Sequence, residues 1–66
     1  MKISVIEAAK IIDASPDFVR RAMQQGTLPI GAAARFDGKW SYNIQSKLLA
    51  DYTGLDIEKE LERIRE

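Results

Sequence analysis

Apolar residues recur at helical spacing near the start of the chain. Glu7 and Lys10 fall on the polar side of a helix whose apolar positions are Val5, Ala8, Ala9, Ile11 and Ile12. Ser4 and Glu7 have the spacing of a capping box, in which each side chain bonds the backbone N–H of the other residue. We therefore expect a helix that begins at Val5 and ends near residues 13–14.

A second helix is predicted directly after the first. Ser15 suits the N-cap, and Pro16 suits the first helical position, where no backbone N–H is needed. Gly26 ends this helix after Gln25, and Pro29 prevents its continuation. The apolar side of the projected helix holds Phe18, Val19, Ala22 and Met23. The opposite side is mostly basic or amide and holds Asp17, Arg20, Arg21, Gln24 and Gln25.

The middle of the chain predicts a β-hairpin. Asp37-Gly38 separates residues 30–36 from residues 39–44, and Asp-Gly favours a type I′ turn, in which both central residues need a positive φ. The second strand alternates, so Trp40 and Tyr42 share one face, and we expect both in the core. Three alanines in the first strand would also suit a helix. With a two-residue loop Arg35 lies opposite Trp40, whereas a bulge would shift that register.

Two short helices are predicted in the last third. One runs from about Gln45 to Thr53 and is closed by Gly54. Asp56 caps the other, whose apolar edge consists of Ile57, Leu61 and Ile64. Because two or three helical turns are marginally stable alone, residues 55–66 should dock either on the domain formed by residues 1–54 or on a partner.

Composition narrows the functional classes. The chain has 66 residues, 45% apolar and 30% charged, which is typical of one soluble globular domain. It contains no Cys and no His, which excludes disulfides, thiolate nucleophiles, Cys/His zinc sites and imidazole bases. We expect no enzyme, no cofactor, no metal and no small-molecule ligand. No apolar run approaches membrane-spanning length, so the cytoplasm is the default compartment and no membrane partner is expected.

The charges balance at 10 basic and 10 acidic residues, but they are unevenly distributed. Between residues 18 and 50 there are five basic residues, and Asp37 is the only acid. A positive face is therefore possible despite the neutral total. A neutral monomer would bind a polyanion weakly, so we expect dimeric or cooperative binding, or tethering to a larger protein.

The predicted order of two helices, a hairpin and two more helices indicates an α+β, mostly helical, small winged helix-turn-helix. The residues that carry a family resemblance are ISVIEAA at 3–9, ASPDFVRRAMQQGTLP at 14–29 and GKWSYNI at 38–44. This pattern resembles the MerR-like and excisionase-like winged helix-turn-helix domains. The resemblance implies a DNA-binding protein of phage or mobile-element type, acting as a transcription regulator or an excisionase-like architectural factor.

The resemblance also implies a site on double-stranded DNA. The second helix would enter the major groove, and the hairpin wing would lie on the adjacent backbone or in the minor groove. The implied contact residues are Ser15, Asp17, Arg20, Arg21, Gln24, Gln25, Arg35 and Lys39. Phe18 departs from the family pattern, because relatives often carry a small polar residue there. Asp17 also has a purely structural interpretation, as a first-turn acid that stabilises the helix dipole.

A second hypothesis uses the same fold for protein assembly. In this case the domain is an antirepressor-like adaptor or the head of a phage DNA-packaging subunit. Its contact surface is the apolar edge of the last helix, which would bind a second copy or a larger protein through Ile57, Leu61 and Ile64.

Overall fold

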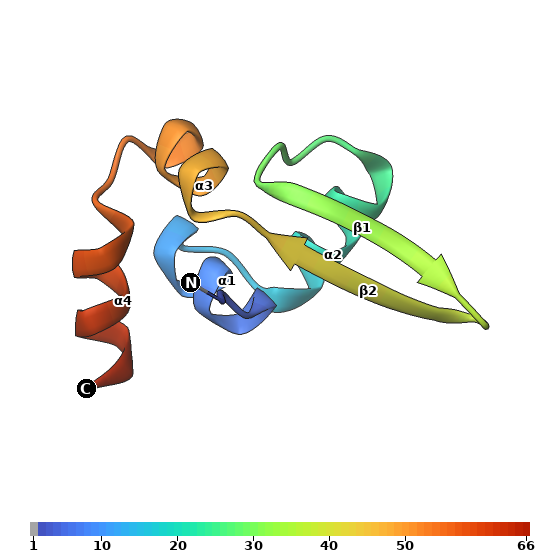
Figure 1. Ribbon diagram of the computed structural model, residues 1–66, viewed down its shortest axis with the longest axis horizontal. Helices are drawn as coiled ribbons and strands as arrows, with labels where there is room; N and C mark the ends of the chain where they lie inside the picture. Colours follow the sequence, from blue (N-terminus) through green and yellow to red (C-terminus); the bar gives the residue numbers. More distant parts are fainter. Residues whose placement is uncertain (1) are drawn as a thin grey trace.

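The computed structural model describes residues 2–66 as four helices and one antiparallel hairpin (Figure 1). In chain order the elements are α1 (Val5–Ile12), α2 (Pro16–Gln25), β1 (Gly31–Phe36), β2 (Lys39–Ile44), α3 (Ser46–Thr53) and α4 (Ile57–Arg65). This order confirms the α+β, mostly helical, winged helix layout. The first strand is extended, so the helical alternative for its three alanines does not hold.

Local side-chain chemistry sets the helix ends. The capping box of α1 forms as predicted, with Ser4 Oγ accepting from Glu7 N at 3.1 Å and Ser4 N donating to Glu7 Oε1 at 3.0 Å. Ser15 Oγ caps α2 by accepting from Phe18 N at 3.1 Å. Asp56 caps α4 by accepting from Lys59 N at 3.3 Å. These bonds satisfy backbone donors that no helical carbonyl can reach.

The turn of the hairpin lies at the two residues predicted for it from the sequence. Asp37 and Gly38 have φ angles of 52° and 77°, both in the left-handed region that a type I′ turn requires. Arg35 pairs with Trp40 along the ladder, so the two-residue loop introduces no bulge. An isolated bridge between Ile3 and Ile44 joins the N-terminal segment to the base of β2.

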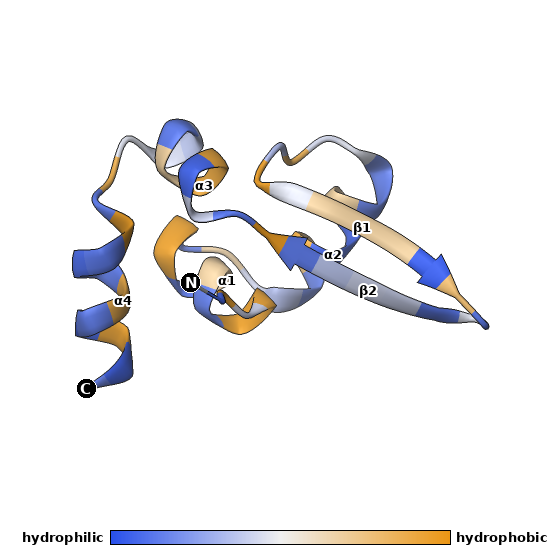
Figure 2. Cartoon of the chain, in the orientation of Figure 1, coloured by the Kyte–Doolittle hydropathy of each residue, from blue (hydrophilic) through white to orange (hydrophobic). Residues whose placement is uncertain are grey.

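The core lies where the helices meet the base of the hairpin. Ile30, Leu49 and Val19 are its largest fully buried side chains. Figure 2 shows apolar segments in α1, α3 and α4, whereas β2 is hydrophilic along most of its length. The core thus consists mainly of helical side chains, and the hairpin contributes chiefly through its base.

Trp40 does not lie in the core, contrary to prediction. Its side chain is 39% exposed, whereas Tyr42, two residues nearer the base, is partly buried and packs against the core. The hairpin projects beyond α2, so the helices cover only its inner half (Figure 1). The alternation of β2 correctly placed Trp40 and Tyr42 on one face of the strand. It could not show how far along the hairpin the helices cover that face.

The last helix docks on its own domain. Ile57 and Leu61 are 4% and 3% exposed within the core, and Ile64 packs against the same core. Of the two docking sites predicted for this helix, the structure shows the one on its own domain: Ile57 and Leu61 are buried there and do not form an open partner surface. Among residues 2–66, no helix has the length and apolar character needed to cross a membrane.

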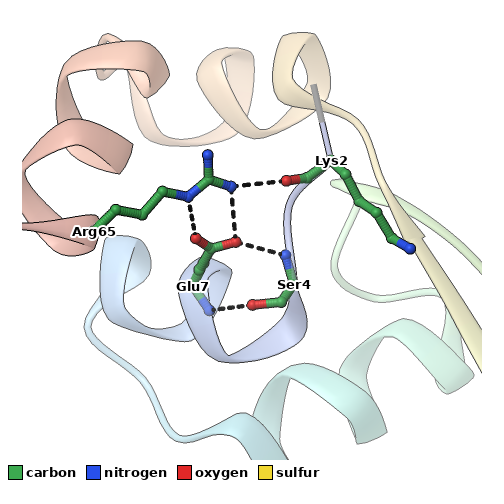
Figure 3. Close-up of polar contacts among 4 residues, drawn as sticks. All are labelled: Lys2, Ser4, Glu7 and Arg65. Carbon is green, nitrogen blue, oxygen red and sulfur yellow. Dashed lines mark hydrogen bonds and ion pairs between the residues drawn. The ribbon is translucent and has the colours of Figure 1, made fainter.

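A polar clasp fastens the end of α4 to the start of α1. Arg65 donates to both carboxylate oxygens of Glu7, and its Nη2 also donates to the Lys2 carbonyl oxygen at 2.9 Å (Figure 3). The Arg65 guanidinium, with the Ser4 backbone N–H, holds the pKa of Glu7 at about 2, below its ordinary 4.5. The carboxylate that caps α1 therefore also anchors α4.

This clasp predicts a specific acid sensitivity. Because the folded pKa of Glu7 is lowered, its stabilising effect is complete above about pH 4.5 and is lost as the pH falls towards 2. Arg65→Gln should lower the free energy of unfolding in urea near neutral pH and reduce its decline below about pH 4.5. Arg63→Gln is the matched control, because Arg63 pairs with Glu60 and leaves the clasp intact. An equal acid decline in both variants would contradict this assignment.

Candidate nucleic-acid interface

The outward face of α2 carries the largest group of predicted contact residues. Arg21, Gln24 and Gln25 are exposed, and Arg20 is partly exposed. Arg20 Nη1 lies 3.2 Å from Asp17 Oδ1, one turn earlier in the helix, and Arg21 has no ion pair among the described residues. The helix thus presents two guanidinium groups to solvent on an otherwise amide-rich face.

The two residues at the start of α2 have structural roles. Ser15 Oγ is occupied by the cap bond from Phe18 N. Asp17 lies in the first turn, and its side chain is 85% exposed in the ion pair with Arg20. An exposed pair of this kind contributes little to stability, so Arg20 can exchange Asp17 for a phosphate at small cost. Ser15 and Asp17 thus lie at the start of the predicted contact face. The side-chain oxygens of both residues already accept hydrogen bonds from residues of α2.

A side-chain bond links α2 to the hairpin. Gln24 Nε2 donates to the Tyr42 hydroxyl at 2.6 Å, across a sequence separation of 18 residues. This bond was not predicted from sequence. The alternation of β2 did place Tyr42 on the inward face, and that was the only signal for it. The bond joins the hairpin to α2 in addition to the packing of α2 against β1.

The outer half of the hairpin carries one cation and one aromatic residue on each face. Arg35 lies opposite Trp40 on the inward face. Lys39 lies opposite Phe36 on the outward face, where Phe36 is 69% exposed. At about 3.4 Å per residue, the Arg35–Trp40 pair lies about 7 Å further along the hairpin than Tyr42. The structure therefore places Arg35 and Lys39 on opposite faces of the outer half of the hairpin, which projects beyond α2 (Figure 1).

A shallow hollow lies on the flank of α2 that includes Phe18. It is lined by Ser15, Asp17, Phe18, Arg21, Ala22, Gln25 and Thr27. Phe18 is 52% exposed, so it lies on the surface and not with Val19, Ala22 and Met23 on the buried side of the helix, where helical spacing placed it. Sequence reasoning did not place Phe18 or Thr27 in the candidate site. Thr27 lies beyond the end of α2, so helical spacing carried no signal for it.

No cluster of three or more Asp or Glu side chains in residues 2–66 could hold a metal ion. The chemistry of the site is that of long, flexible hydrogen-bond donors on a convex helix and a projecting hairpin. Comparisons with protein-family models, with curated proteins and with solved structures found no match to this chain.

Proposed function

We propose that this protein binds double-stranded DNA, with α2 in the major groove and the hairpin on the adjacent backbone or in the minor groove. The observation that carries the proposal is the attachment of the hairpin to α2 by the Gln24–Tyr42 bond. That bond and the packing of α2 against β1 hold the basic face of α2 and the hairpin next to each other. The proposal includes the MerR-like or excisionase-like role of a regulator or architectural factor in the cytoplasm.

The chemistry of α2 supports this docking mode. An α-helix fits the major groove, and Arg and Gln side chains can reach base edges or phosphates. Arg21 is free of ion pairs within residues 2–66, and Arg20 holds only an exposed pair with Asp17. Both guanidinium groups can therefore turn to the nucleic acid without leaving a buried carboxylate unpaired.

The hairpin supplies the second contact. Lys39 and Arg35 lie on opposite faces of its outer half, so whichever face meets the backbone presents a cation. Asp37 in the turn is the one acid there, and Asp is among the residues that tolerate the left-handed φ of 52° found at this position. The hairpin thus carries a net positive charge where it leaves the domain.

The test is an amide NMR titration with a generic DNA duplex, performed at low salt and repeated at a few-fold higher salt. Shifts should cluster on Arg20, Arg21, Gln24 and Lys39, and they should fade with salt because phosphate contacts release counterions. Trp40 is the only Trp in the chain, so its fluorescence reports directly on the hairpin. Binding that leaves both α2 and Trp40 unperturbed would contradict the proposed docking.

A further inference from the structure

The outward face of α3 exposes apolar side chains that the proposed DNA contact does not use. Leu48 and Tyr52 lie one turn apart on the helix and are 36% and 52% exposed, whereas Leu49 is fully buried. Leu55, just after the helix, is 41% exposed. Adjoining exposed apolar side chains of this size are typical of interaction surfaces.

The charges beside these residues are self-complementary. Lys47 and Asp51 are exposed one turn apart along one flank of the Leu48–Tyr52 stripe. If a second α3 lies antiparallel on this face about a twofold axis, the same flanks of the two helices meet. Lys47 of each copy then faces Asp51 of the other, and the two apolar stripes cover each other.

We propose that the outward face of α3 binds the same face of a second copy, so that copies on neighbouring DNA sites bind cooperatively. This inference rests on the proposed DNA-binding function. A neutral monomer binds DNA weakly, so a contact between copies would strengthen binding. Because the apolar edge of α4 is buried, the outward face of α3 is the surface that could make this contact. α3 packs against α4, whereas α2 packs against α1 and β1, so the two surfaces lie on separate parts of the domain.

The small size of the face determines the kind of association. An eight-residue helix covers much less than the roughly 800 Å² per partner of a standard stable interface. Two free copies should therefore associate weakly. Copies already held side by side on one duplex have a high effective concentration, and there the same contact becomes significant. A cooperative contact, rather than a permanent dimer, is the expected result.

The first experiment uses the protein without DNA. Amide shifts recorded over a dilution series should move at Leu48, Asp51 and Tyr52 and remain constant on α2. Sedimentation at the highest concentration should show a rise in average mass towards the dimer. Concentration-independent shifts on α3 together with a monomer mass throughout would overturn the proposal.

A charge exchange then tests the geometry of the contact. Lys47→Asp places like charges across the twofold axis and should weaken both self-association and cooperativity on a duplex with two adjacent sites by roughly tenfold. The double variant Lys47→Asp with Asp51→Lys restores opposite charges and should recover both. Lys10→Asp makes the same charge change on α1 and is the control. Failure of the double variant to recover would overturn the antiparallel contact.

The outcomes separate this inference from the proposed function. DNA binding with α2 shifts but without self-association or cooperativity overturns the α3 contact alone. Self-association through α3 without any salt-dependent DNA binding overturns the proposed function alone. Circular dichroism of each variant checks that the folded helix content is unchanged, since Lys47 and Asp51 are also neighbours within the helix.

Discussion

Gly31→Ala is expected to remove a large share of the stability of this domain. A Cβ atom at residue 31 would lie 2.0 Å from the Asn43 carbonyl oxygen and 2.9 Å from the Ile44 Cα. Both are backbone atoms of β2, so no side-chain rotation can relieve the overlap. The base of the hairpin would have to open next to Ile30, which is fully buried and whose carbonyl accepts from Gln45 N at 2.9 Å.

The expected loss is a large share of the total stability, because the 2.0 Å overlap with a backbone atom places it at or above the upper end of the range for overpacking. Overpacking of a well-packed site costs about 1–3 kcal/mol and occasionally more. A domain of this size seldom has more than about 3–5 kcal/mol of stability. The variant should therefore melt far below the parent protein when its helix content is followed by circular dichroism.

Gly26→Ala is the matched control for this prediction. Gly26 has a φ of 74°, and an added Cβ there meets no atom within 4 Å. Its cost is therefore the left-handed strain alone, about 1–2 kcal/mol, and the variant should remain folded. If Gly31→Ala melted close to Gly26→Ala, the tight approach of β1 to β2 would not be the reason for glycine at residue 31.

Arg20→Glu combined with Arg21→Glu should weaken DNA binding at least about 100-fold. Each arginine can make a charge-assisted hydrogen bond to DNA, worth about 1.5–3 kcal/mol, and each glutamate would add repulsion from phosphate. The folded state should change little, since Arg20 loses only an exposed ion pair and Arg21 has none within residues 2–66. Fluorescence anisotropy with a labelled duplex at low salt measures the loss.

The control for the arginine pair is Lys10→Glu with Lys59→Glu. It changes the net charge by the same amount at exposed positions of α1 and α4. A comparable loss of affinity in both double variants would mean that the total charge governs binding, and it would contradict a specific role for α2. A thermal melt of each variant confirms that the comparison is made between folded proteins.

The features that sequence predicted well depend on short-range chemistry. The caps at Ser4, Ser15 and Asp56 require only a side-chain oxygen near backbone N–H groups two or three residues away. The turn at Asp37-Gly38 fixes the hairpin register, and the pairing of the two strands follows from it. Helical spacing likewise placed Val19, Ala22 and Met23 on the buried side of α2, but it wrongly placed Phe18 there, since Phe18 is exposed.

The features that sequence missed depend on where elements meet in space. The exposure of Trp40 depends on how far α2 extends beneath the hairpin, which no local pattern encodes. The Gln24–Tyr42 and Glu7–Arg65 bonds join residues 18 and 58 positions apart. For the last helix, the amphipathic pattern is equally suited to its own domain and to a partner, so only the packed structure could decide between the two.

The clasp at Arg65 also places the two ends of the described chain next to each other. Because Arg65 donates to the Lys2 carbonyl oxygen, residues 2 and 65 are neighbours, and both lie far from the tip of the hairpin (Figure 1). A short linker could join them without stretching the fold, as in proteins that tolerate circular permutation. A fluorophore or a surface tether attached at the C-terminal end of α4 would stay far from the tip of the hairpin.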